Sequence, residues 1–194
     1  LYRDGRRPDV VAWGRSLKED LSRRDFTFNS MAVDVARRQL YDPYAGVNDL
    51  QQRVVRAVGD ASQRCEEDAL RILRAYRFTR RDSGPLWSMD GELVSAIARH
   101  STRLGMVAIE RRWMEVRKVL LGPKPGAVLR SMQDDGVLRH VFERLVVINP
   151  ALFEAMDDDR LHRLNLHQRL ALTLVEHPSK AVSYTHLRAH ETYP

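Results

Sequence analysis

The residues best suited to chemistry lie in one stretch of the sequence, between residues 64 and 81. On a helical wheel that starts at Asp68, with about 100° per residue, the apolar side chains fall on one buried stripe, formed by Ala69, Ile72, Leu73 and Tyr76. Arg71, Arg74 and Arg77 fall on the opposite side. The helix rises about 13–14 Å between Asp68 and Arg77, about the length of a nucleoside triphosphate. The spacing fits a bound nucleotide, and a solvated basic helix face is the alternative.

The elements that must position these side chains change in character near residue 60. Before that point we predict short strands and turns. They are a strand at Val10–Trp13, a helical turn from a Ser16/Glu19 capping box to Leu21, a strand pair within Met31–Tyr41 with its tip at Arg37–Arg38, and a turn at Asp42–Gly46.

After residue 60 the spacing of apolar residues becomes helical. The predicted helices are Glu66–Arg81, Gly91–His100, Val107–Leu121 and Ala127–Asp135. Glycine and proline separate them, and Gly122–Gly126 is predicted as a linker. The fold class that follows is α+β, a small α/β part followed by an all-helical part.

Composition excludes several classes of protein. The chain has 194 residues, a formal net charge of +6 and 43% hydrophobic residues, which fits a folded soluble domain. No apolar run is long enough to cross a bilayer, and no secretory signal is visible. A single cysteine, Cys65, excludes an intrachain disulfide. Arginine supplies 28 of the 32 basic residues, which favours phosphate-bearing partners. We expect a cytoplasmic protein without a membrane partner or a predicted protein partner.

Both ends of the sequence are unusual. The chain begins at Leu1 without an initiator methionine, and residues 182–194 resemble a translated sequencing adapter. We therefore expect a piece of a longer protein, with native sequence ending near Ala181 and a non-native tail after it.

Four ordered blocks carry a family resemblance. They are Arg23–Ala32, Asp42–Gly46 with Asp49–Leu50, Arg56–Asp60, and Glu67–Phe78. In this order and at these gaps they resemble the bacterial-type (class II) tRNA nucleotidyltransferase (CCA-adding enzyme) and poly(A) polymerase family, over about residues 3–145. The resemblance implies that residues 1–60 are the C-terminal part of a nucleotidyltransferase head. It further implies that residues 61–145 are a helical neck and that residues 146–181 begin a helical body.

The resemblance also assigns nucleotide-binding roles. Arg24 would recognise the sugar and phosphates, and Asp25 would accept a hydrogen bond from a ribose hydroxyl. An N-cap on the turn that begins at Phe26 is the alternative for Asp25. Asp68 and Arg71 would act as a protein template for the base, because a carboxylate accepts from the amino group of C or A while a guanidinium donates to the adjacent ring acceptor. Arg74 and Arg77 would complete the set of side chains that binds the nucleotide and its phosphates.

One motif of the family is absent. The family carries a Gly-Gly turn followed by an Asp-x-Asp pair, and the two carboxylates hold two Mg²⁺ ions. This sequence has no Gly-Gly turn followed by such a pair. Asp157–Asp159 has the spacing but lies in helical surroundings, so we predict a helix-end acidic cluster there. We predict His162 and His167 as surface histidines. No catalytic or metal-binding residue is therefore assigned to this chain, and the Mg²⁺ ligands are expected in a missing N-terminal segment.

The function that the resemblance implies is the addition of C and A nucleotides to tRNA 3′ ends from CTP and ATP, with release of pyrophosphate. The chain alone is expected to bind CTP and ATP weakly and to be inactive. A poly(A) polymerase, a specialist that adds only CC or only A, and a non-catalytic basic RNA-binding module remain as alternatives.

Overall fold

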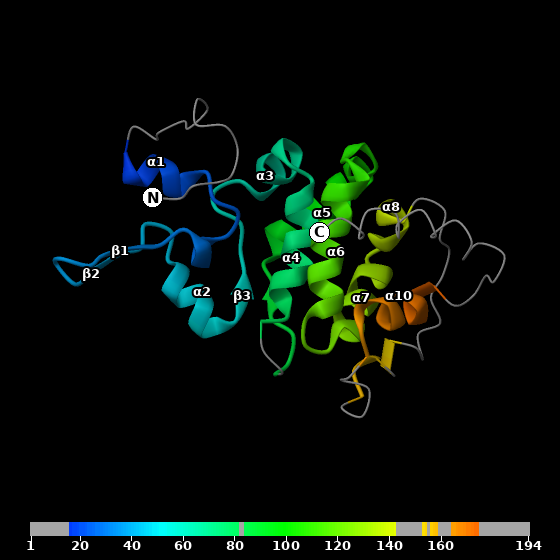
Figure 1. Cartoon of the computed structure of the whole chain (residues 1–194). Helices are drawn as coiled ribbons and strands as arrows, with labels where there is room; N and C mark the ends of the chain where they lie inside the picture. Colours follow the sequence, from blue (N-terminus) through cyan, green and yellow to red (C-terminus); the bar gives the residue numbers. More distant parts are fainter. Residues whose placement is uncertain (1–15, 82–83, 143–152, 155, 159–163, 175–194) are drawn as a thin grey trace, which may run out of the picture.

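The fold has a small mixed part and a larger helical part, as the sequence predicts (Figure 1). The computed structural model describes residues 16–81, 84–142, 153–154, 156–158 and 164–174. The strand predicted at Val10–Trp13 lies outside these residues. No helix among the described residues is both long and apolar enough to cross a membrane.

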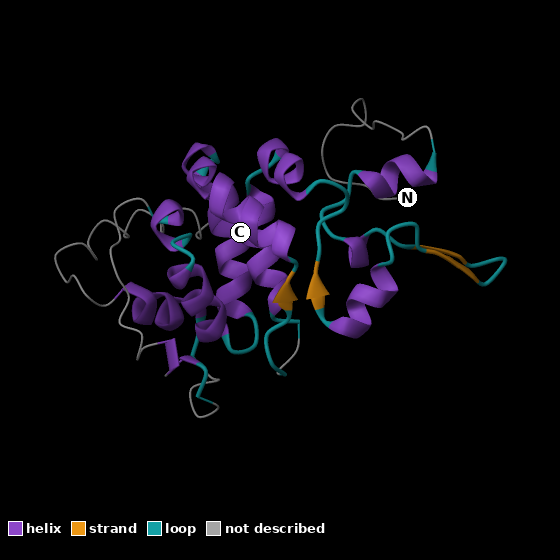
Figure 2. Ribbon diagram, turned by 180° about the vertical axis from the view of Figure 1, so that it is seen from behind, coloured by secondary structure: helices purple, strands orange, loops and turns teal. Residues whose placement is uncertain are grey.

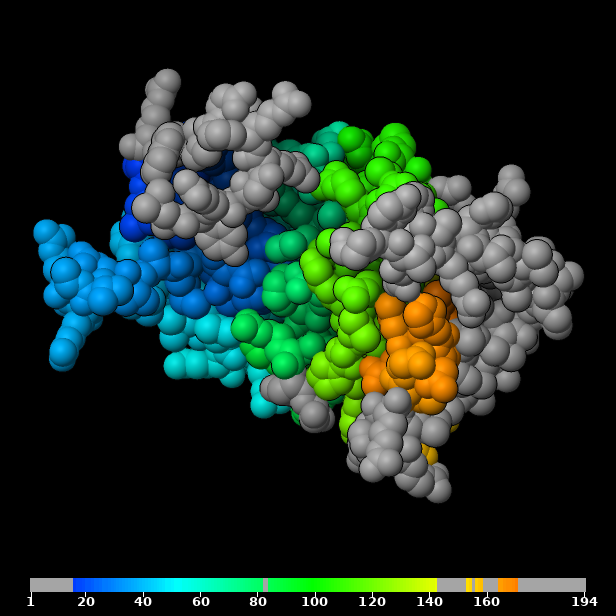
Figure 3. All heavy atoms as spheres, viewed as in Figure 1, coloured from blue at the N-terminus to red at the C-terminus, as the bar shows by residue number. Residues whose placement is uncertain are grey.

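The mixed part begins with local structures that the sequence predicts. Helix α1 (Leu17–Ser22) starts at Ser16, whose hydroxyl accepts from the Glu19 N–H at 3.2 Å. After the 3₁₀ turn η2 (Thr27–Asn29), strands β1 (Ala32–Asp34) and β2 (Gln39–Tyr41) form an antiparallel hairpin in which Val33 pairs with Leu40. The hairpin projects from the body of the molecule (Figure 3, blue, left). The predicted strand pair is therefore confirmed.

The turn after the hairpin is held by one side chain. Both carboxylate oxygens of Asp42 accept from the backbone, from the N–H of Gly46 at 2.7 Å and from that of Val47 at 2.9 Å. Helix α2 (Gly46–Gln52) starts there and leads into strand β3 (Val54–Val55). Strand β3 pairs in parallel with β4 (Ser88–Met89) of the helical part, as Figure 2 shows in orange, so this short sheet joins the two parts of the fold.

The predicted helix Glu66–Arg81 is wrong at its start. The chain forms two helices, α3 (Ala61–Glu67) and α4 (Leu70–Thr79), because Asp68 is extended, with φ −148° and ψ 101°. The Asp68 carboxylate accepts from the Leu70 N–H at 3.1 Å and so caps the second helix. The break separates the packing of the two helices, since α3 packs on α5 (Gly91–His100) while α4 packs on α6 (Ile109–Leu121).

The remaining helices complete the helical part, and α6 and α7 (Pro125–Asp134) pack on α4. Helix α5 has the predicted bounds, and the 3₁₀ helix η3 (Ser101–Met106) leads from it to α6, which starts two residues later than predicted. The linker predicted at Gly122–Gly126 is shorter than expected, because α7 already begins at the second of the linker's two prolines, Pro125. Helices α8 (Leu138–Val141) and α10 (Leu166–Leu174) follow, and α10 packs against α6.

The core runs along the predicted apolar stripe. Ala69, Ile72, Leu73 and Tyr76 are each buried, as the wheel predicts. Val116 of α6 and Leu129 of α7 pack into the same core. Since α4 contacts α3, α6, α7, β3 and β4, the stripe is covered on several sides. The opposite, arginine-bearing side of α4 is therefore the side available for the candidate site.

Candidate functional site

Three of the predicted site residues gather where the mixed part meets α4 and α6. Asp25 comes from the segment just before η2, and Arg74 and Arg77 come from α4. The α4 arginines do not form a solvated face: the side chains of Arg71, Arg74 and Arg77 are only 17%, 32% and 23% exposed. Tertiary packing therefore places these guanidiniums between two parts of the protein.

Asp25 and Arg74 form the central contact. Arg74 Nε donates to Asp25 Oδ2 at 2.9 Å, and Arg74 Nη2 makes a second contact to the same oxygen. The other oxygen, Oδ1, accepts from the N–H of Phe26 at 2.9 Å and from the side chain of Asn29 at 3.0 Å. Asp25 thus holds the segment at Phe26 while it also faces an arginine of α4. It does not act as the N-cap that was its alternative role, because Phe26 itself is the N-cap of η2 and no side chain caps this turn.

The electrostatics of Asp25 follow from these contacts. Burial alone raises the pKa of the carboxyl group, but the positive charge of Arg74 and hydrogen bonds from Asn29, Arg74 and Phe26 outweigh it, so the pKa lies below its ordinary value. Asp25 is therefore ionised at neutral pH. A buried, ionised carboxylate of this kind can accept hydrogen bonds from hydroxyl groups.

Arg77 pairs with a carboxylate that sequence reasoning did not assign to the site, Glu115 of α6. Arg77 Nε lies 2.8 Å from Glu115 Oε2, as a close ion pair without the alignment of a hydrogen bond. The guanidinium also lies over the Phe78 ring, 4.2 Å from its centroid. Burial lowers the pKa of Arg77; Glu115 opposes this shift and Arg74 adds to it. Glu115 and the Phe78 ring thus hold the Arg77 guanidinium in place from two sides.

The structure does not bring the side chains of Asp68 and Arg71 together. The Asp68 carboxylate lies 3.0 Å from Nη2 of Arg111, a partner that sequence reasoning did not assign to it. Arg71 Nη1 lies 3.3 Å from Glu67, and its Nη2 donates to the Arg23 carbonyl oxygen at 3.3 Å. The two residues remain linked by the backbone, where the Arg71 N–H donates to the Asp68 carbonyl oxygen at 3.0 Å.

Arg24 lies apart from this cluster. Its guanidinium pairs with Asp20 of α1 at 2.8 Å, and both side chains are about half exposed. This is an ordinary i, i+4 surface pair. The role predicted for Arg24 therefore requires it to leave Asp20.

The acidic and histidine residues near the C-terminal end do not form a metal site in the described structure. Both oxygens of Asp157 accept from the first turn of α7, from the N–H of Gly126 at 2.7 Å and from that of Ala127 at 2.8 Å. His167 is exposed, whereas His162 and Asp159 lie outside the described residues. Among the residues described, no three His, Cys, Asp or Glu side chains come together as metal ligands.

Sequence reasoning missed Glu115 because its two arginine partners lie on another helix. A glutamate on an amphipathic helix usually faces solvent, and nothing in the spacing of α6 marks this one as 3% exposed. The sequence placed it only within the predicted helix Val107–Leu121. The site combines buried carboxylate acceptors with guanidinium donors, the pattern that suits a sugar and its phosphates.

Two family models match the chain. The model described as "Poly A polymerase head domain" matches residues 1–56. The model described as "Probable RNA and SrmB- binding site of polymerase A" matches residues 88–148. Together they cover more than half of the chain, one in the mixed part and the other in the helical part.

Curated relatives and solved structures agree with these matches. The CCA-adding enzyme of Pediococcus pentosaceus is 43% identical over 68% of this chain and 32% of its own length. That of Lactiplantibacillus plantarum is 41% identical over 72% and 33%. The crystal structure of the Bacillus stearothermophilus CCA-adding enzyme in complex with CTP matches with a TM-score of 0.74 and 28% identity, over 93% of this chain and 44% of that one. The chain spans about a third of the length of the curated relatives.

Proposed function

Because the chain belongs to the class II CCA-adding enzyme and poly(A) polymerase family, whose head and neck it carries, we propose that it acts in adding C and A nucleotides to the 3′ ends of tRNA. The nucleotides would come from CTP and ATP, with pyrophosphate as the leaving group. The observation that carries the proposal is the meeting of Asp25 from the head with Arg74 and Arg77 from the neck, in a chain about 40% identical to CCA-adding enzymes.

The nucleotide would lie across this junction. Asp25 would accept from the ribose, and Arg74 and Arg77 would face the phosphates, since a guanidinium offers several donors to phosphate oxygens. Arg24 would reach the sugar and phosphates after it leaves its exposed partner Asp20, an exchange with a low energetic cost because exposed ion pairs contribute little.

The base would be read by Asp68 and Arg71 at the start of α4. Both side chains have competing partners, Arg111 for Asp68 and Glu67 for Arg71. The Asp68–Arg111 pair is partly exposed, so a base can replace it at low cost. The carboxylate would then accept from the amino group of C or A, and the guanidinium would donate to the neighbouring ring nitrogen or carbonyl oxygen. U and G present a carbonyl oxygen, an acceptor, where C and A present the amino donor.

Magnesium is the cofactor that we propose, because the polymerase head family typically uses metal ions. Such ions would activate the attacking 3′-hydroxyl and stabilise the leaving pyrophosphate. Among the described residues no metal ligands come together, so we propose nucleotide and RNA binding as the role of this chain's own residues. The tRNA 3′ end is the proposed RNA partner, supported by the +6 charge and the match to an RNA-binding model. The cytoplasm is the proposed compartment.

A titration with the four nucleoside triphosphates tests the proposal. We expect the chain to bind CTP and ATP more tightly than GTP and UTP, as measured by calorimetry or NMR. The double variant Asp68→Ala/Arg71→Ala should bind all four with similar affinity, because it lacks the donor and acceptor that read the base. Equal binding of all four nucleotides by the unaltered chain would refute the template role.

Poly(A) polymerase activity is a second candidate, favoured by the head-domain match over residues 1–56. The same titration separates the two functions. A CCA-adding enzyme must accept both CTP and ATP, whereas a poly(A) polymerase needs ATP alone. Tight binding of ATP without binding of CTP would therefore favour the second candidate.

A further inference from the structure

Glu115 is a buried carboxylate that contacts several cations at once. It lies in the middle of α6 and is 3% exposed. Its Oε2 lies 2.8 Å from Arg77 Nε, and its Oε1 accepts from Lys118 Nζ at 2.7 Å and lies 3.8 Å from Arg74 Nη1. Two of these three cations are the arginines that face the nucleotide in the proposed function.

We propose that Glu115 is a positioning residue, which holds the guanidiniums of Arg74 and Arg77 in the orientation that receives the phosphates of the incoming nucleotide. This inference rests on the proposed function and assigns a new residue to it. Glu115 is buried beneath the two arginines, and it would act through them without touching the nucleotide.

The geometry of Arg77 supports this role. One face of its guanidinium is covered by the Phe78 ring, and its Nε edge faces Glu115. A guanidinium has five N–H donors and one carboxylate can accept only some of them, so donors remain for phosphate oxygens. A long side chain that is already ordered loses less entropy when it binds.

Arg74 links the same carboxylate to the head. It lies between Glu115 of α6 and Asp25 of the head, to which it is hydrogen bonded. Displacement of the Glu115 carboxylate would therefore disturb both arginines and, through Arg74, the carboxylate proposed to bind the ribose. A charged group held by two buried partners has little freedom to relax.

The charge-preserving variant Glu115→Asp tests the proposal. It keeps the negative charge but withdraws the carboxylate by one methylene, so any change reports position and not net charge. We expect the dissociation constant of the chain for CTP to rise about tenfold, the effect of one lost charge-assisted hydrogen bond. The affinity for cytidine, which has no phosphates, should stay within twofold. Both are measured by NMR titration of the full chain.

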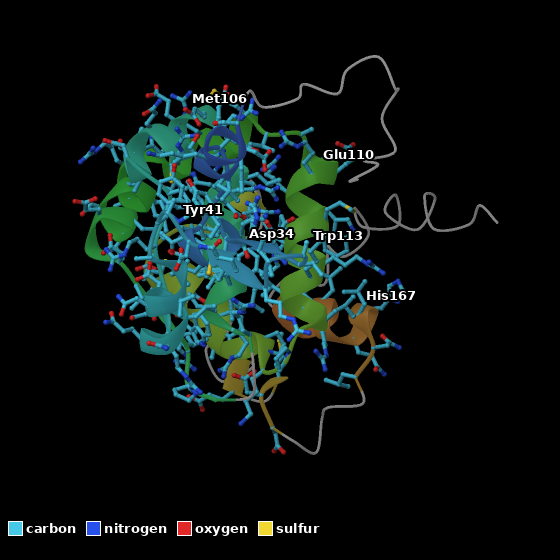
Figure 4. The ribbon with its side chains drawn as sticks, turned by 90° about the vertical axis from the view of Figure 1, so that its left-hand side faces the viewer. Asp34, Tyr41, Met106, Glu110, Trp113 and His167 are labelled. Carbon is cyan, nitrogen blue, oxygen red and sulfur yellow. The ribbon has the colours of Figure 1, made fainter. Side chains whose placement is uncertain are left out.

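Glu110→Asp is the matched control. Glu110 lies on the same helix, one and a half turns before Glu115, but is exposed at the edge of the molecule (Figure 4). This variant should bind CTP like the unaltered chain. An equal loss in both variants, or an equal loss of CTP and cytidine binding in Glu115→Asp, would overturn the positioning role.

A second variant covers the case in which Glu115→Asp does not fold. Glu115→Gln keeps the shape of the side chain, and the exchange of the Arg77 Hε proton with solvent is then followed by NMR. We expect exchange at least about tenfold faster than in the unaltered chain, since Glu115→Gln removes the negative charge 2.8 Å from Arg77 Nε, which holds the guanidinium in place and repels the hydroxide that catalyses exchange. Unchanged exchange would overturn the proposal. The absence of any nucleotide binding by the unaltered chain would contradict the proposed function itself. Normal CTP binding by Glu115→Asp would contradict only the positioning role of Glu115.

Discussion

At the scale of single residues, burial separates two kinds of arginine that look alike in the sequence. Arg24 and Arg74 each pair with an aspartate, but the Asp20 partner of Arg24 is half exposed whereas the Asp25 partner of Arg74 is 8% exposed. Exposed ion pairs contribute little to stability, whereas removal of one member of a buried pair leaves an uncompensated charge. The Asp25–Arg74 pair of the candidate site is therefore also a part of the fold that is sensitive to mutation.

Asp25→Asn should destabilise the chain by about 1.5–3 kcal/mol, because Arg74 loses its charged hydrogen-bond acceptor. The pKa of Asp25 is lowered in the folded chain, so its contribution is present above the unfolded pKa and is lost as the pH falls through the folded pKa. The variant should accordingly lose less stability than the unaltered chain below about pH 4. Urea unfolding at several pH values measures both effects.

The control for this prediction is Asp20→Asn, which removes the same charge from an exposed pair. It should cost less than about 1 kcal/mol. Equal costs for the two variants would show that the buried pair has no special role in stability.

At the scale of secondary-structure elements, caps decide where helices begin and therefore where functional groups point. Asp68 is extended and caps α4, so its carboxylate lies at the junction of α3 and α4 and not on a helix face. Asp42 performs the same task for α2 through two backbone hydrogen bonds. The first residue of the Asp42–Gly46 turn therefore fixes the start of the helix that follows.

Gly46→Ala should be destabilising because α2 begins in close contact with η2. A Cβ atom at Gly46 would lie 2.4 Å from the Thr27 carbonyl oxygen, and backbone cannot move aside as a flexible side chain can. We expect a cost of about 1–3 kcal/mol, measured by thermal unfolding. Gly91→Ala at the start of α5 meets no atom within 4 Å and serves as the control, which should be neutral or slightly stabilising. A neutral Gly46→Ala would show that η2 and α2 can separate freely.

At the scale of the whole molecule, a few contacts join the head to the helical part. Strand β3 pairs with β4, the Phe26 ring packs edge-on against the Phe78 ring of α4, and Arg74 binds Asp25. Arg56 adds a further link, since it pairs with Asp49 of α2 and with Asp90, the N-cap of α5. The proposed nucleotide site lies at this junction, so its geometry depends on how firmly the two parts are held.

Arg56→Ala should loosen the junction. Asp49 is 2% exposed and would keep only the Thr27 hydroxyl, at 2.6 Å, of its two side-chain partners. We expect a loss of about 1.5–3 kcal/mol and faster hydrogen exchange of η2 and α2 than of α4, measured by mass spectrometry. Arg103→Ala removes an arginine from the exposed pair with Glu66 and should change neither quantity appreciably. Uniform exchange across the chain would contradict the role of Arg56 as a link.

The sequence alone was enough for features that depend on neighbours along the chain. The Ser16 cap, the hairpin around Arg37–Arg38, the bounds of α5 and the buried stripe of α4 each follow from spacing within one or two turns. The order of the four blocks also identified the family, which the relatives and family models confirm. These features are local or linear, so a sequence records them directly.

Only the tertiary structure decided which charges meet. Asp25 and Arg74 are 49 residues apart, and Glu115 reaches Arg77 from a different helix. Asp68 and Arg71 are close in sequence, yet each side chain faces another partner. The physical reason is that a charge is satisfied by whichever opposite charge the packing of the core brings near. That packing is driven by the burial of apolar surface, so the positions of the apolar residues do not indicate which charged side chains will meet.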